Sequence, residues 1–132
     1  MIQELQIKTK EKEEIVDITE KIKKIVKESN KEEGICLVFT KHTSAAITIN
    51  ENEDPNINID ILNGLKELVP DNKNWLHNKR CNNAAAHIKV SLVGQSELIP
   101  IKDNELQLGT YQGIDFVELD GPRTRTVIVQ II

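Results

Sequence analysis

The apolar run Val127–Ile132 constrains the fold of this chain more than any other feature of the sequence. Both alternating faces of this segment carry apolar side chains, so a strand formed by it must be covered on both sides, which predicts a central strand. From residue 86 onward, shorter apolar segments follow one another and are separated by Gly, Asn and Gly-Pro. They predict four more strands, over residues 88–92, 98–101, 106–108 and 114–119.

The first thirty residues combine strand and helix patterns. Residues 2–8 alternate and predict a strand, and residues 14–16 predict the start of a return strand after a polar turn. Asp17 and Glu20 have capping-box spacing, and the apolar residues that follow recur at helical spacing. A helix is therefore expected over residues 18–29.

Two apolar runs, Ile35–Thr40 and Ala45–Asn50, flank a short polar turn that contains His42. This arrangement predicts a β-hairpin with the histidine at its turn. The dipeptide Asp54-Pro55 predicts the start of a second helix, because Asp is a favoured N-cap and Pro a favoured first helical residue. Pro70 predicts the end of that helix.

The chain has few aromatic residues to build a core. They make up 3% of the sequence, whereas hydrophobic residues together make up 39%. The core must therefore consist of Ile, Leu and Val, and β-branched residues favour sheet. With 132 residues, no repeat and no linker, we expect one compact α+β domain over residues 1–132, mostly antiparallel sheet with two main helices.

Charge and hydropathy argue against several classes of partner. The formal net charge is −4, which argues against nucleic acid, because phosphate binding needs an excess of Lys and Arg. No stretch approaches the roughly 18 apolar residues that span a bilayer, and the first ten residues lack a signal-peptide pattern, so no membrane partner is expected. Cys36 lies in an apolar run and Cys81 in a polar loop. We expect no disulfide between them, which fits a cytoplasmic location.

Only three histidines occur, His42, His77 and His87, and each lies at a junction or in a predicted loop. Three imidazoles with a nearby carboxylate are a ligand set typical of Zn²⁺ or a similar divalent ion. Their spacing is not diagnostic, so three unrelated histidines are the alternative. The strand predicted over residues 88–92 would place Lys89 on the same face as His87.

The run Thr48–Asp54 places three carboxylates and two amides at a strand-to-helix junction. These groups could supply oxygen ligands for Mg²⁺ or a general base. Asp54 has a structural explanation as a helix N-cap, whereas Glu51 has none. The same helix N-terminus could instead bind a phosphate through its free N–H groups.

Further polar candidates lie in turns: Thr43, Ser44, Thr110, Gln112, Arg123 and Arg125. The first two adjoin a histidine and could form an anion cradle. The next two lie between two glycines, where a tight turn with a bulge is as good an explanation as a ligand loop. The arginines could bind phosphate, although solvated charges at a hairpin explain them equally well.

Three long segments resemble the signatures of the YjbQ-like family, the so-called secondary thiamine-phosphate synthases. They are Phe39–Pro55, with a His-Thr-Ser-Ala turn before Asn-Glu-x-x-Asp-Pro, then Ala86–Gly94, and then Leu108–Ile114 together with Asp120–Arg123. The segments occur in the family's order and cover most of residues 35–132. One departure is Tyr111, where the family usually has Trp, and another is the loop between the last two histidines, which varies in the family.

The resemblance implies a compact α+β fold assembled as a homotrimer, with histidines and acidic residues near subunit boundaries. It also implies a transferase with thiamine-phosphate synthase activity. This reaction joins a pyrimidine diphosphate to a thiazole phosphate and releases pyrophosphate. The activity is called secondary because enzymes of unrelated fold also supply it. The expected partner is therefore a small phosphorylated substrate.

In our leading hypothesis, His42, Glu51 and Asp54 hold a divalent ion, Mg²⁺ or Zn²⁺, against the leaving pyrophosphate. His77 and His87 complete the metal site or act as acid and base. The expected substrate-binding residues are Thr43, Ser44, Lys89, Thr110, Gln112 and Arg123, of which the glutamine would orient the acceptor.

Two other functions need the same residues. In the first, the chain is a metal-dependent hydrolase of small phosphorylated compounds, with the three histidines as ligands and Glu51 as base for a metal-bound water. In the second, it is a non-catalytic trimeric protein that binds a small phosphorylated ligand. Because all three functions use the same polar side chains, the sequence does not separate them.

Overall fold

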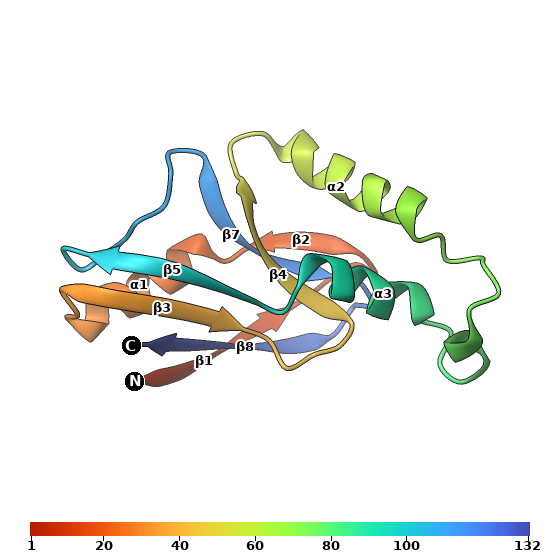
Figure 1. Cartoon of the computed structure of the whole chain (residues 1–132), viewed down its shortest axis with the longest axis horizontal. Coiled ribbons are helices and arrows are strands. Elements are labelled where there is room, and N and C mark those ends of the chain that lie inside the picture. The colour runs from red at the N-terminus through yellow and green to blue at the C-terminus, as the bar shows by residue number, and fades with distance from the viewer.

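The computed structural model describes residues 1–132 as two antiparallel β-sheets with three α-helices (Figure 1). The strands are β1 (Ile2–Lys8), β2 (Glu14–Asp17), β3 (Glu33–Phe39), β4 (Ala45–Glu51), β5 (Ser96–Lys102), β6 (Glu105–Leu106), β7 (Gln112–Glu118) and β8 (Thr124–Ile131). The helices are α1 (Thr19–Ser29), α2 (Pro55–Leu68), the short 3-10 helix η1 (Leu76–Lys79) and α3 (Ala84–Val93). The α+β class predicted from the sequence is confirmed.

The two sheets face each other across the main core. The larger has the strand order β1-β8-β3-β5-β6 and the smaller has the order β2-β7-β4. The C-terminal strand is central as predicted, because β8 pairs with β1 on one side and β3 on the other. Only one of its faces is fully buried, however, and Ile128 on the other face is half-buried, so the prediction of two covered faces is wrong for a single chain. The core between the sheets is aliphatic apart from Phe116 and Cys36, and burial raises the pKa of the Cys36 thiol to about 11.

The smaller sheet has two different faces. Its inner face carries Ile47 and Phe116, which belong to the main core. Its outer face carries Ala46 and Val117, which pack with α3 residues such as Val90 in a second, smaller cluster. Helix α3 therefore lies against the outer face, where it contacts β4 (Figure 1).

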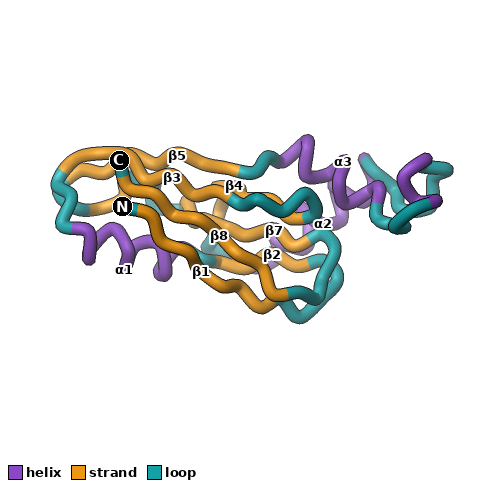
Figure 2. Tube along the Cα trace, turned by 90° about the horizontal axis from the view of Figure 1, so that it is seen from below, coloured by secondary structure: helices purple, strands orange, loops and turns teal.

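Figure 2 shows helix α1 along one side of the strands. It contacts β6, β7 and β8. Its apolar side chains enter the main core, so the predicted helix is confirmed. The predicted capping box is wrong. Asp17 accepts hydrogen bonds from the N–H and hydroxyl of Thr19, while Glu20 pairs with Lys23.

The hairpin predicted around His42 is also wrong, although both of its strands exist. β3 belongs to the larger sheet and β4 to the smaller one, so residues 40–44 carry the chain from one sheet to the other. The apolar patterns of the two runs are real. They reflect two strands that cover the same core from opposite sides, because each has one face in that core.

The strand predicted over residues 88–92 is a helix, α3. Three consecutive alanines at its start have the highest helix propensity of any residue, and the Oδ1 atom of Asn78 accepts a hydrogen bond from the N–H of Ala84. The alternation of Ile88 and Val90 with polar residues is therefore not a consequence of strand geometry. As a consequence, Lys89 and His87 do not share a strand face.

Helix α2 begins at the predicted Asp54-Pro55 dipeptide, and the Asp54 carboxylate accepts a hydrogen bond from the N–H of Asn56. None of its fourteen residues is fully buried. Ile59 and Leu68 are exposed, at 57% and 73%. No helix of the structure has the length and apolar character to cross a bilayer. Helix α2 thus leaves an apolar surface open on the outer face of the smaller sheet.

Candidate functional site

Two of the three histidines meet at one end of the molecule. The rings of His77, in η1, and His87, in α3, lie edge to face with their centroids 5.0 Å apart. The Nδ1 atom of His87 lies 2.8 Å from the backbone oxygen of Thr43. Since a carbonyl oxygen only accepts hydrogen bonds, Nδ1 of His87 donates here, and in the neutral imidazole Nε2 is the free acceptor.

The two rings open into a cavity of about 520 Å³. Its walls are mainly apolar and come from the loop after β3, from η1 with its preceding residue, and from α3; they comprise Thr43, Trp75, Leu76, His77, Ala84, His87 and Ile88. Such a volume suits a small ring compound, and apolar walls with a few directed polar groups are typical of ligand pockets. We call this cavity the histidine pocket.

His42 lies next to this pocket but has another contact. Its Nε2 atom accepts a hydrogen bond from the backbone N–H of Thr126 at 3.0 Å. Burial, and then the positive charge of Arg125, lower the pKa of His42, so its imidazole is neutral near pH 7. Nε2 is occupied by β8, which leaves only Nδ1 of His42 for any ligand.

The acidic candidates lie at the other end of β4. Glu51 pairs in register with Gln112 of β7, and the N–H of Asn52 donates to the backbone oxygen of Tyr111. The side chain of Gln112 accepts a hydrogen bond from the N–H of Gly109, which closes the loop that contains Thr110. We call this group, with Asp54 at the start of α2, the acidic end.

The histidine pocket and the acidic end are separated by the whole of β4. Six residue steps along a strand correspond to about 20 Å, so one chain does not bring His42 into contact with Glu51 and Asp54. No group of three or more His, Cys, Asp or Glu side chains is close enough to hold a metal ion. The metal cluster of our leading hypothesis therefore does not form within a single chain.

Two predicted phosphate contacts have structural partners. Lys89 is 1% exposed, and its Nζ lies 2.8 Å from a carboxylate oxygen of Glu13. Ser44 is buried, and its hydroxyl accepts a hydrogen bond from Arg125. A substrate would have to displace these contacts, so neither side chain is free to bind it in this structure. Arg123 is exposed and pairs with Asp120.

A basic groove adjoins the histidine pocket and was missed by sequence reasoning. It has a volume of about 490 Å³ and shares Trp75 and Leu76 with the histidine pocket. Lys73 and Lys79 line it, and Nζ of Lys73 lies 5.8 Å from the ring centroid of Trp75. The signal in the sequence was the only Trp of the chain, set in a Lys- and Asn-rich loop.

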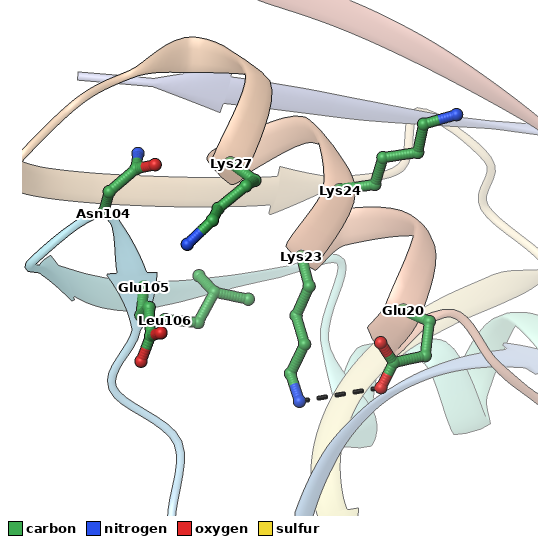
Figure 3. Close-up of a pocket in the computed structure, with 7 residues that line it drawn as sticks. All are labelled: Glu20, Lys23, Lys24, Lys27, Asn104, Glu105 and Leu106. Atoms are coloured by element: carbon green, nitrogen blue, oxygen red, sulfur yellow. Dashed lines mark ion pairs between the residues drawn. The ribbon is translucent and has the colours of Figure 1, made fainter.

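A further cavity, of about 450 Å³, lies between α1 and the β5–β6 turn (Figure 3). Three lysines of α1 line it, but Lys23 pairs with Glu20, and Figure 3 shows Lys24 pointing away from the β5–β6 side. Glu105 adds a second negative charge. The charges of this cavity nearly cancel, and none of the histidines lines it, so it is not our candidate site.

The family model for UPF0047 protein YjbQ-like matches residues 3–132. UPF0047 protein MJ1081 of Methanocaldococcus jannaschii is 50% identical over 132 residues, covering 100% of this chain and 94% of that protein. UPF0047 protein YugU of Bacillus subtilis is 41% identical over 135 residues and covers 100% and 99%.

Solved structures agree with these matches. An uncharacterized conserved protein of the yjbq/upf0047 family from Clostridium acetobutylicum superposes with a TM-score of 0.94 at 46% identity, covering 98% of this chain and 99% of that one. A YbjQ-like protein of unknown function from Sulfolobus solfataricus gives 0.96 at 37% identity, covering 99% and 95%. The sequence and the structure comparisons therefore point to the same family.

Proposed function

This chain belongs to the UPF0047 YjbQ-like family, and from that membership and the histidine pocket we propose that it is a transferase of the thiamine-phosphate synthase type. The reaction joins a pyrimidine diphosphate to a thiazole phosphate. The proposal rests on one observation, an apolar, imidazole-bearing pocket next to a lysine-lined groove that shares Trp75 and Leu76 with it.

The two depressions match the two parts of such a substrate. The histidine pocket, about 520 Å³ in volume, suits an aromatic heterocycle, which can stack on apolar and aromatic walls. The adjoining groove supplies the ammonium groups of Lys73 and Lys79 for phosphate oxygens. A heterocycle that carries a phosphate chain therefore fits with its ring in the pocket and its phosphates in the groove.

The chemistry is a displacement in which a ring nitrogen of the thiazole forms a bond to the exocyclic carbon of the pyrimidine. The bond between that carbon and the diphosphate oxygen breaks, and the diphosphate leaves with the electron pair. Lysine charges stabilise the negative charge that develops on the leaving group. The free Nε2 of His87 can accept a hydrogen bond from an amino group on the pyrimidine and so orient the ring.

A divalent ion bound by the protein remains part of this proposal only if a neighbouring subunit supplies some of its ligands. The pocket offers two imidazoles, of His77 and His87, and no third ligand of the usual kinds close enough to complete a site. A structural or catalytic zinc site needs at least three protein ligands. Within one chain, the groups available to stabilise the leaving diphosphate and orient the ring are therefore the lysines of the groove and the imidazoles of the pocket.

We also propose that the chain assembles as a homotrimer, which the family resemblance led us to expect. A threefold ring is heterologous, so two different surface patches of neighbouring subunits meet, and we propose that these are the two ends of β4. The histidine pocket and the acidic end lie at opposite ends of β4 and each carries an exposed apolar side chain, Leu76 at 79% and Tyr111 at 61%. Ring closure would bring Glu51 of one subunit toward the histidines of its neighbour.

The test is formation of thiamine phosphate by the purified protein, with Mg²⁺ and both heterocycles. We expect His87→Ala to lower kcat/KM at least tenfold, and Lys73→Ala with Lys79→Ala to raise KM for the diphosphate at least tenfold. Lys23→Ala with Lys27→Ala is the matched control, because it removes two lysines from the cavity of Figure 3, and it should leave turnover unchanged.

Other outcomes would select another function. Release of phosphate from small esters without a condensation product would show a hydrolase. Saturable binding of phosphorylated ligands without turnover would show a binding protein. Equal loss of activity in the control pair would show that lysine charge acts at a distance, not through contact in the groove.

A further inference from the structure

Four buried side-chain oxygen atoms have no hydrogen-bond partner: Oδ1 of Asn83, just before α3, and three atoms that belong to β7 and α2. Two of them are the carboxylate oxygens of Asp115, a residue of β7 that is 0% exposed. The third is Oδ1 of Asn58 in α2. Buried polar atoms in native proteins almost always have partners, so orphaned oxygens need a specific explanation.

The register of the sheet places other oxygen groups beside Asp115. Its neighbour across β2 is Asp17 and its neighbour across β4 is Thr48, and residues directly opposite each other share one face. The Asp17 carboxylate accepts hydrogen bonds from Thr19 and Asn52. Asp17 is exposed, Asp115 is fully buried and Thr48 is half-buried, so the buried carboxylate lies in the middle of the row Asp17–Asp115–Thr48.

The contacts between α2 and β2 indicate where the Asn58 oxygen lies relative to this row. Lys66 pairs with Glu13 at 3.6 Å, and Leu62 packs in the cluster that also contacts Ile15. Each step of four residues along the helix, about 6 Å, matches a step of two residues along β2, about 6.6 Å. Extended by one more step in both elements, this spacing points to Asn58 lying near Asp17 and so near the row that contains Asp115.

A proton alone does not satisfy this arrangement. Burial, and then the charge of Asp17, raise the pKa of Asp115 to about 7. A protonated carboxyl has one O–H to donate, so at most one of the other orphaned oxygens would gain a partner. One small cation can contact several oxygens at once and offset the two carboxylate charges.

We propose that Asp115, Asp17, Asn58 and Thr48 form a binding site for a hard divalent cation of the Mg²⁺ or Ca²⁺ class. All the donors are oxygen atoms, which these ions prefer, and the exposed side of Asp17 leaves room for water to complete the coordination. The ion would link β2, β4 and β7 to α2, a helix with no fully buried residue of its own. This site is separate from the histidine pocket.

The test is calorimetric titration of the full chain, freed of metal by chelation, with MgCl₂ and with CaCl₂ separately. We expect one site per chain for at least one of the ions. Asp115→Asn should weaken binding at least tenfold, and Asn58→Asp should tighten it at least tenfold by adding a third carboxylate. His87→Ala should leave this binding unchanged.

Asp60→Asn is the matched control, because it removes an exposed carboxylate from α2. It should bind like the native chain. Absence of saturable binding to the native chain, or equal binding by Asp115→Asn, overturns the proposal and leaves Asp115 as a protonated acid. If Asp115→Asn does not fold, Asn58→Ala decides, because it removes one proposed ligand from a helix residue that is not fully buried, and equal binding by this variant overturns the proposal.

Discussion

Arg125 and Glu118 form an ion pair enclosed between the two sheets, with side chains 3% and 0% exposed. Nε of Arg125 donates to one carboxylate oxygen at 2.9 Å and Nη2 donates to the other. Thr9 donates a further hydrogen bond to the same carboxylate. We predict that Arg125→Met lowers the free energy of unfolding by about 3–5 kcal/mol, since it leaves a buried charge without a partner.

Urea denaturation of the single and double variants checks this prediction. Arg125→Met combined with Glu118→Leu should recover most of the loss, because replacing both charges by apolar groups removes the unpaired carboxylate. A double variant as unstable as the single one would contradict the ion-pair explanation. It would indicate that the arginine acts through packing or through its hydrogen bond to Ser44.

The same pair predicts a dependence of stability on pH. Burial by itself would raise the pKa of Glu118, but hydrogen bonds from Arg125, Thr9 and the N–H of Asp120 outweigh it, and the pKa is lowered. A lowered pKa in the folded state stabilises the protein above the unfolded value of about 4.3, and that stability is lost as the pH falls through the folded value. Thermal unfolding of the native chain should therefore lose stability below about pH 4.3 faster than that of Glu118→Gln.

Equal slopes for the native chain and this variant would show that Glu118 does not titrate in that range.

At this residue scale the sequence predicted the histidines as candidates but not their partners. The apolar neighbours of Lys89 and Asp115 gave no sign that charged groups would be buried, since burial depends on which elements cover them. Propensity and spacing carry no information on such long-range contacts.

At the element scale, substitutions of Asp54 distinguish a structural role as helix cap from a catalytic role. Its carboxylate caps α2 by accepting from the N–H of Asn56 at 2.9 Å. We predict that Asp54→Ala lowers the free energy of unfolding by about 1 kcal/mol, while Asp54→Ser, which keeps a capping oxygen, costs only a few tenths. Chemical denaturation checks both values. Turnover that falls with Asp54→Ser while stability holds would instead favour the metal or substrate role expected from the sequence.

Elements with a cap and a helical period were predicted, whereas residues 88–92 were not. Asp54-Pro55 marks its helix locally, and so do the apolar residues of α1. In residues 88–92 apolar and polar side chains alternate, which favours a strand. The three preceding alanines favour a helix, but only a window that starts at residue 84 includes them. An alternation of five residues is too short to separate the two periods.

At the scale of the whole molecule, the pairing of strands could not be predicted from the sequence. Local patterns gave most of the strands, but β3 and β4 lie in different sheets although only five residues separate them. The length of β4, which the sequence did predict, separates the histidine pocket at one end from the acidic end at the other. A heterologous ring of subunits provides a physical route by which the two groups could still meet.

Mixing two inactive variants tests that route. If each active site combines the histidines of one subunit with Glu51 of the next, His87→Ala and Glu51→Gln are each inactive alone. After unfolding and refolding together in equal amounts, about a quarter of the composite sites carry both native residues, and activity should return to about a quarter of the native value. Native mass spectrometry of the mixture should show trimers of mixed composition.

Mixed trimers without activity would place Glu51 and His87 in separate roles. Recovery would explain why a chain with two imidazoles in its pocket keeps a carboxylate about 20 Å away at the far end of β4.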